Sequence, residues 1–168
     1  DSAAAVRQLG FDEAGVGHRQ ASPTTLPLRL PRLALGCMGF GSSAWRPWVL
    51  DEPAALGVLA RALEAGVTFF DTANVYSTGR SEIVLGRMLR AAQARERVIV
   101  ATKLFFPVGA GEAGLSRRNV LESCDASLRR LGLERIDLLQ IHCYDEATPV
   151  EETMLALDEL VRAGKVAH

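Results

Sequence analysis

The chain has 168 residues, of which 48% are apolar and 23% charged, and its formal net charge is -1. This length suits one domain with a hydrophobic core, and the charge provides no global field to recruit nucleic acid or an anionic membrane. No apolar run approaches the roughly 20 residues that a membrane helix needs, and the first residues lack the pattern of a secretory signal. The three cysteines have no C-x-x-C spacing, which favours reduced thiols in a cytoplasmic protein and no metal site.

Residues 1–31 have the weakest pattern for regular structure. Pro23, Pro27 and Pro31 fall within the run ASPTTLPLRLP. Proline removes a backbone donor and drives the residue before it toward an extended conformation. We therefore predict an N-terminal arm or loop over residues 1–31 and a folded domain over residues 32–168.

From residue 32 onward, strand and helix patterns alternate along the chain. Short apolar runs, most of them rich in β-branched or aromatic residues, predict strands at 33–36, 67–70, 97–103 and 135–142. Apolar residues at helical spacing predict helices between and after them, at 51–66, 81–92, 116–132 and 149–164. The final residues, KVAH, look like the opening of another strand.

Three of these helices have more detailed patterns. Ser81 and Ser116 are expected to cap helix N-termini with their hydroxyls. One apolar helix face consists of Val120, Cys124, Leu128 and Leu131. A second consists of Val150, Met154, Leu157 and Val161. A solvated helix surface is expected for Arg117, Arg118, Arg129 and Arg130.

Near-continuous apolar strands that alternate with helices are typical of a parallel sheet covered by helices. The predicted strand ends recur every 32 to 39 residues, at Gly36, Asp71, Lys103 and His142. Eight units of this size would need roughly 280 residues, which is the size of a (β/α)8 TIM barrel. We therefore predict an α/β fold, the first half of a TIM barrel with about four βα units. A doubly wound open sheet has the same periodicity, but the turn GCMGFGSS does not lead straight into a helix as a dinucleotide fingerprint should.

Three ionisable side chains stand at successive strand ends, Asp71, Lys103 and His142. In a parallel barrel these ends share the rim where active sites are built. Each residue alone has a structural explanation, but an acid, an amine and an imidazole together favour a catalytic site. Tyr76, five residues after Asp71, adds a phenol. A phenol is a weak acid at neutral pH, so an ammonium held by a carboxylate would make it a better proton donor, and an imidazole could orient a carbonyl oxygen.

The segments VTFFDTANVYSTGRSEIVLG, VIVATK and SLRRLGLERIDLLQIH resemble the aldo-keto reductases, in family order and spacing over about residues 32 to 167. FFDTANVYS, and QIH followed by YD-x-x-TP, look most like a bacterial, aryl-alcohol-dehydrogenase-like branch. The resemblance implies an NADPH-dependent oxidoreductase that reduces an aldehyde or ketone without a metal ion. It implies that Tyr76 is the general acid, that Lys103 and Asp71 tune it, and that His142 orients the substrate.

The same resemblance places the nicotinamide end of NADP(H) at this rim. It implies cofactor contacts from Gly36, Cys37, Met38 and Asp71. Candidates for substrate binding are Trp45, Trp48, Tyr76 and His142. The two tryptophans follow the first strand in SSAWRPWVLDE, where covering the barrel mouth is an equally good explanation. Cys143 is expected to pack rather than to act as a nucleophile.

The chain departs from the family pattern at both ends. Its arm lacks the usual hairpin turn before the first strand, and it stops where the family continues with most of its cofactor-binding strands. A half barrel would leave sheet edges unpaired and inward side chains uncovered. Candidates for apolar inward side chains are Leu33, Leu35, Phe69, Ile99, Ala101, Leu139 and Ile141. We therefore expect a homo-oligomer, or completion by a missing C-terminal half, and poor NADPH binding by this chain alone.

Two other functions stay open on the sequence. One is a truncated, catalytically inactive aldo-keto reductase that acts through oligomerisation. The other is a regulatory subunit like those that family relatives provide to potassium channels. Those relatives typically have Asn at the position of His142, which argues against this role.

Overall fold

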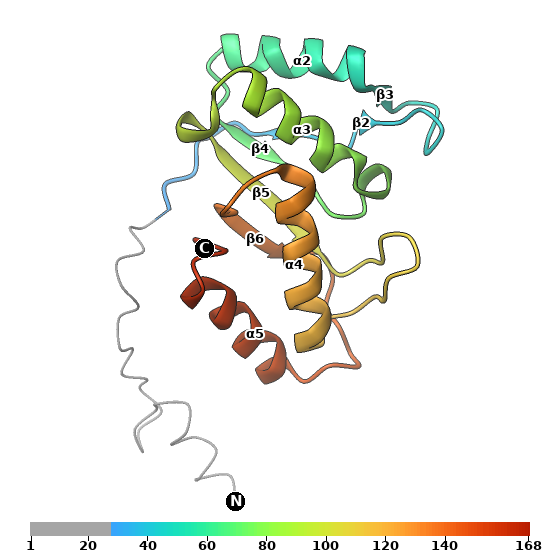
Figure 1. Cartoon of the computed structure of the whole chain (residues 1–168), viewed down its shortest axis with the longest axis vertical. Coiled ribbons are helices and arrows are strands. Elements are labelled where there is room, and N and C mark those ends of the chain that lie inside the picture. Colours follow the sequence, from blue (N-terminus) through green and yellow to red (C-terminus); the bar gives the residue numbers. More distant parts are fainter. Residues whose placement is uncertain (1–27) are drawn as a thin grey trace, which may run out of the picture.

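The computed structural model describes residues 28–168, and Figure 1 shows a sheet flanked by helices. Its four strands pair in parallel in the order β1 (Leu35–Gly36), β4 (Phe69–Asp71), β5 (Ile99–Leu104) and β6 (Leu138–Ile141). A separate short parallel pair is formed by β2 (Phe40–Gly41) and β3 (Leu50–Asp51). Most of the predicted arm lies outside the described residues, and residues 28–34 contain no helix or strand.

The C-terminal residues extend the sheet beyond β6. Val166 forms a parallel bridge with Ile136, and the backbone N–H of Ala167 donates to the Ile136 carbonyl over 2.9 Å. The N–H of Leu139 donates to the carbonyl of His168, also over 2.9 Å. The prediction that KVAH opens another strand is therefore confirmed.

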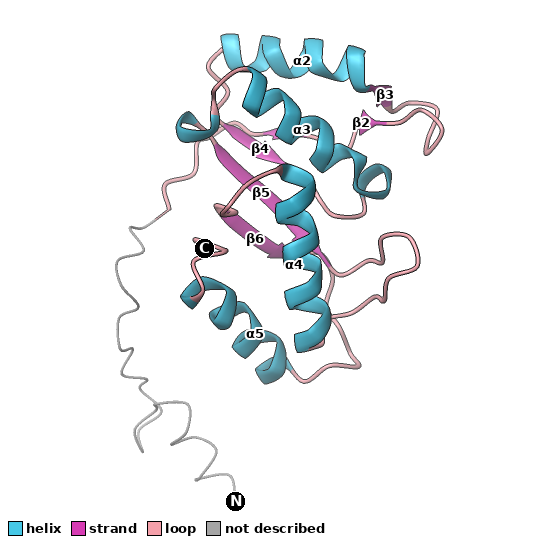
Figure 2. Ribbon diagram, viewed as in Figure 1, coloured by secondary structure: helices cyan, strands magenta, loops and turns pink. Residues whose placement is uncertain are grey.

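Helices follow the strands in chain order. They are α2 (Glu52–Glu64), α3 (Arg80–Ala91), α4 (Arg117–Leu131) and α5 (Val150–Arg162). Each contacts the next, so together they cover one face of the sheet (Figure 2). Phe70 and Val100 point into this layer and are fully buried, whereas Phe69 and Ile99 on the other face are only partly buried. The main core therefore lies between the sheet and the helices.

Local sequence explains where α4 begins and ends. The hydroxyl of the N-cap residue Ser116 accepts a hydrogen bond from the N–H of Asn119 over 3.3 Å. Gly132 ends the helix with a φ of 66°, which glycine adopts without the steric cost of a Cβ. The predicted apolar face is confirmed by the burial of Val120, Cys124 and Leu131.

One expectation for the helices is wrong, and another is wrong in part. Ser81 does not cap α3, because the preceding turn continues directly into the helix and Gly79 occupies the N-cap position. In α5, Val150 and Met154 are 51% and 55% exposed. The buried face consists instead of Thr153, Ala156 and Leu160. Of the predicted face, Leu157 and Val161 are partly buried and pack against the core, so the prediction is wrong only for Val150 and Met154.

The strand register corrects the predicted inward face. Cross-strand partners in a parallel sheet point to the same side, and successive residues alternate. Leu35 pairs with Phe70, and Ile141 pairs with Leu104, so both lie on the helix side together with Leu139. Leu33 is 66% exposed and precedes β1. The other face carries Phe69, Ile99, Ala101 and Leu138, and at its carboxyl end Asp71, Lys103 and Gln140.

Candidate active site

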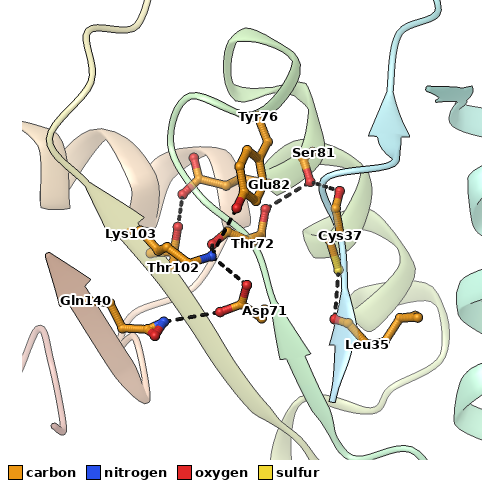
Figure 3. Close-up of polar contacts among 10 residues, drawn as sticks. All are labelled: Leu35, Cys37, Asp71, Thr72, Tyr76, Ser81, Glu82, Thr102, Lys103 and Gln140. Carbon is orange, nitrogen blue, oxygen red and sulfur yellow. Dashed lines mark hydrogen bonds and ion pairs between the residues drawn. The ribbon is translucent and has the colours of Figure 1, made fainter. Parts of the chain in front are cut away.

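The structure brings the four predicted catalytic residues together at one end of the sheet. Asp71 is the last residue of β4, Lys103 lies near the end of β5, and His142 follows β6. Tyr76 opens the short 3-10 helix η1 (Tyr76–Gly79) that connects β4 to α3. Figure 3 shows the Lys103 side chain between Asp71 and Tyr76. These positions follow from the topology, because the carboxyl ends of parallel strands share one edge of the sheet.

The Lys103 ammonium makes three polar contacts. It donates to Asp71 Oδ1 over 2.5 Å, to the carbonyl oxygen of Thr72 over 2.9 Å and to Tyr76 Oη over 3.3 Å. An ammonium has three protons, so these contacts account for all of its donors. The Lys103 and Asp71 side chains are only 16% and 27% exposed, so water screens their attraction less than at an open surface. The amine is thus fixed between a carboxylate and a phenol.

A strained turn presents Tyr76 to the site. Ser77 and Thr78, which follow it, have φ values of 51° and 54°, and Gly79 has a φ of 87°. Two consecutive non-glycine residues in the left-handed region are uncommon and cost energy. The residue that follows β2 stabilises this turn, because the N–H of Ser42 donates a hydrogen bond to Ser77 Oγ over 2.8 Å. A Cβ at Gly41 would overlap Ser77, which explains a glycine there.

His142 is packed between two aromatic rings. Its ring meets Tyr76 edge to face with centroids 5.8 Å apart, and it meets Phe106 with centroids 5.0 Å apart. Burial lowers the pKa of His142 below 6.5, the Lys103 ammonium lowers it further, and the Asp71 carboxylate opposes the shift. The imidazole is therefore neutral at neutral pH, with one N–H to donate. Among the described residues, nothing bonds to its buried Nδ1 atom.

Gln140 is a site residue that sequence reasoning missed. Its Nε2 atom donates to Asp71 Oδ2 over 3.1 Å, so both carboxylate oxygens of Asp71 are bonded (Figure 3). The available signal was its position two residues before His142, which places both side chains on one face of a strand. Phe106 was also missed, because it lies in a loop after β5.

A buried polar network lies behind the site and corrects one expectation. Glu82 is fully buried and accepts hydrogen bonds from Thr102 Oγ1 over 2.7 Å and from Arg130 Nε over 2.6 Å. Arg130 was expected in a solvated face, but only 18% of its side chain is exposed. Ser81 Oγ bonds to Thr72 Oγ1 over 2.9 Å and to the Cys37 carbonyl over 2.7 Å. The network ties α3 to residues adjacent to Asp71 and Lys103.

The predicted cofactor loop is only partly accessible. Gly36 and Met38 are exposed, but Cys37 is fully buried and its thiol points to the carbonyl of Leu35 over 3.6 Å. Burial, together with the nearby Asp71 carboxylate, raises the pKa of Cys37 to about 12. Its backbone N–H donates to the Asp71 carbonyl over 2.7 Å. Cys37 therefore packs the loop against the strands as a neutral thiol.

The two tryptophans lie on the loop between β2 and β3. Their rings meet edge to face with centroids 6.2 Å apart, and Trp48 is 55% exposed. The rings that contact His142 are those of Tyr76 and Phe106. Across residues 28–168, no group of three or more His, Cys, Asp and Glu side chains could hold a metal ion. In the same range, no helix combines the length and apolarity needed to cross a membrane.

An acid, an amine, a phenol and an imidazole lie at the carboxyl ends of parallel strands, which is where α/β barrels have their active sites. The model of the Aldo/keto reductase family matches residues 32–168. The chain therefore belongs to the aldo/keto reductase family.

Comparisons with individual proteins agree with this assignment. The chain is 40% identical over 161 residues to the versiconal hemiacetal acetate reductase of Aspergillus parasiticus, covering 84% of this chain and 47% of that protein. It is 36% identical over 167 residues to a putative aryl-alcohol dehydrogenase of Schizosaccharomyces pombe, with 84% and 47% covered. The chain thus spans about half the length of the curated relatives it matches.

A solved structure confirms the expected fold class. The holo form of the aldo-keto reductase AKR11C1 from Bacillus halodurans matches with a TM-score of 0.73 and 32% identity. The match covers 89% of this chain and 48% of that one. The observed sheet and helices are thus one half of a TIM barrel, and the doubly wound alternative is excluded.

Proposed function

We propose that the protein reduces an aldehyde or ketone to an alcohol with NADPH, with Tyr76 as the general acid. The observation that carries this proposal is the Lys103 ammonium, which joins the Asp71 carboxylate to the Tyr76 phenol. Family membership supports the oxidoreductase class. Two relatives are named as a hemiacetal acetate reductase and a putative aryl-alcohol dehydrogenase, which supports a small carbonyl compound or its alcohol as the substrate.

The residues present fit a nicotinamide beside the site. Gly36 pairs with Asp71 in the sheet register, and a Cβ at Gly36 would meet no atom within 4 Å. Met38 is 43% exposed on the same loop. We assign Gly36 and Met38, next to Asp71, to holding this end of the cofactor. When bound, NADPH supplies the hydride that the carbonyl carbon accepts.

The protein's own side chains handle the proton in this proposal. Tyr76 Oη gives its proton to the carbonyl oxygen, and the Lys103 ammonium stabilises the phenolate that remains. The Asp71 carboxylate pairs with the Lys103 ammonium and holds it in place. The neutral His142 imidazole donates a hydrogen bond to the same carbonyl oxygen and orients it. Trp45 and Trp48 are assigned to the substrate side of the site.

We also propose that the active protein contains a complete barrel. The relatives are about twice as long, and the face opposite the helices leaves Phe69, Ile99 and Leu138 only partly buried. A further polypeptide segment or a second copy of this chain would cover this face. The free thiols of Cys37, Cys124 and Cys143 support a cytoplasmic location.

The decisive experiment is a substitution of Tyr76, made in a form of the protein whose barrel is complete. Tyr76→Phe should lower kcat for carbonyl reduction by about 10²- to 10⁴-fold, because the phenol donates the proton in the transition state. The affinity for NADPH, measured by fluorescence titration, should stay nearly unchanged. Tyr144→Phe is the matched control, since Tyr144 is 71% exposed and should leave both quantities unchanged. Equal losses of cofactor affinity and turnover in Tyr76→Phe would show that the assigned role is wrong.

A further inference from the structure

Gln140 lies on the same face of the sheet as the proposed catalytic residues. In the register of β5 and β6 it pairs with Lys103, so both side chains point to one side. Its amide reaches across β5 to Asp71 on β4, where Nε2 donates to Oδ2 over 3.1 Å. This side chain therefore joins β6 to β4 across β5, at the carboxyl end of the sheet (Figure 3).

The Asp71 carboxylate needs a second partner to keep its orientation. The terminal torsion of an aspartate has broad preferences, so one bond from Lys103 to Oδ1 leaves the carboxylate plane free to turn. The bond from Gln140 to Oδ2 removes that freedom. Asp71 in turn holds the Lys103 ammonium in position. The contact between Gln140 and Asp71 therefore affects the hydrogen bond between Lys103 and Tyr76.

The chemistry of an amide suits this position. The ionisable groups at this end of the sheet, within the described residues, include Asp71 from β4, Tyr76 from η1, Lys103 from β5 and His142 just after β6. A cation in place of Gln140 would compete with Lys103 for Asp71, and an anion would repel Asp71. A neutral donor satisfies the second oxygen and leaves the ion pair intact.

We propose that Gln140 is a positioning residue, which orients Asp71 and through it sets the contact between Lys103 and Tyr76. This inference deepens the proposed function and rests on it. Gln140 needs no contact with substrate or cofactor in this role. Its effect should therefore appear in kcat and in the geometry of Asp71, and not in NADPH affinity.

The test uses a form of the protein whose barrel is complete and compares three variants, Gln140→Met, Leu138→Met and Gln140→Glu. Gln140→Met keeps the size of the side chain and removes the donor, and it should lower kcat roughly tenfold, because small displacements of catalytic groups slow the reaction. NADPH affinity and the unfolding temperature should stay unchanged. Leu138→Met, on the same strand and face, is the matched control and should behave like the wild type. Full activity in Gln140→Met would overturn the inference.

Gln140→Glu separates positioning from a structural effect. The introduced carboxyl can donate to Asp71 only when protonated, and once ionised it repels Asp71. Its activity relative to wild type should therefore fall as pH rises above about 4.3, the usual pKa of glutamate, which Asp71 shifts upward. The activity of Gln140→Met relative to wild type should be independent of pH. Parallel, pH-independent losses in both variants would show a structural role and refute the inference.

A measurement that does not depend on catalysis tests the role of Gln140 separately from the proposed function. The carboxylate carbon resonance of Asp71, assigned with Asp71→Asn, should shift or broaden in Gln140→Met and stay in place in Leu138→Met. If the wild type reduces no carbonyl compound, the proposed function fails, while this resonance still decides whether Gln140 orients Asp71. An unchanged resonance would overturn the inference whatever the activity.

Discussion

At the scale of residues, the environment of His142 has a consequence for stability. Burial and the Lys103 ammonium lower the pKa of this imidazole from 6.5 in the folded protein. Between the lowered pKa and 6.5 the unfolded chain binds more protons at His142 than the folded protein does. The contribution of His142 to the free energy of unfolding must then rise with pH through this window. It is lost as pH falls from 6.5 toward the pKa of His142 in the folded protein.

Replacement of His142 by a neutral side chain should remove this dependence. We expect the free energy of unfolding of the wild type, minus that of His142→Gln, to decrease as pH falls from about 7.5 to about 5. Denaturant unfolding at several pH values measures this difference. A difference that stays constant over this range would contradict the lowered pKa.

At the scale of elements, α3 and α4 are in direct backbone contact at Gly86. A Cβ at this position would overlap the carbonyl group of Leu131, the last residue of α4. Main chain cannot give way as a flexible side chain can, so the close approach requires glycine. Because α3 follows the turn with Tyr76 and α4 supplies Arg130 to Glu82, this contact also supports the candidate site.

Two alanine substitutions test this packing. Gly86→Ala should reduce the free energy of unfolding by about 1–3 kcal/mol, because the helices must separate to admit the methyl group. Gly57→Ala is the matched control in α2, where a Cβ would meet no atom within 4 Å. It should increase stability by about 0.5–1 kcal/mol through lower chain entropy. Thermal or denaturant unfolding of both variants gives the comparison, and equal effects would contradict the close contact.

At the scale of the whole molecule, the sheet has one covered face and one open face. Parallel sheets in stable proteins are buried on both faces. The described residues place helices on one face only, and Phe69, Ile99 and Leu138 on the other are partly buried. Covering such a surface stabilises a protein by roughly 25 cal/mol for each Å² of apolar area. This favours association of the chain with itself or with a segment that completes the barrel.

The isolated 168-residue chain should therefore sediment as a dimer or a larger assembly at micromolar concentration, and it should bind NADPH poorly. Leu138→Lys, on the open face, should weaken self-association. Val58→Lys, at a 41% exposed position of α2, should leave it unchanged. A compact monomer that unfolds cooperatively and binds no hydrophobic dye would contradict the expected assembly.

The sequence alone was sufficient for the alternation of strands and helices, the parallel sheet and the rim position of Asp71, Lys103 and His142. These features depend on local periodicity and on strand ends, which can be read along the chain. The sequence alone did not predict the register of the strands or the contacts of side chains across them. A one-residue change of register reverses every face of a strand, which is why Leu139 and Ile141 were misplaced.

Contacts between distant segments were decided only by the tertiary structure. Gln140 bonds to Asp71 across β5, and Arg130 pairs with Glu82 between two helices. No local pattern identifies the partners of these side chains, because those partners lie 69 and 48 residues away. Sequence periodicity therefore determined which residues reach the site edge, and the packing of helices on the sheet determined which polar groups hold them there.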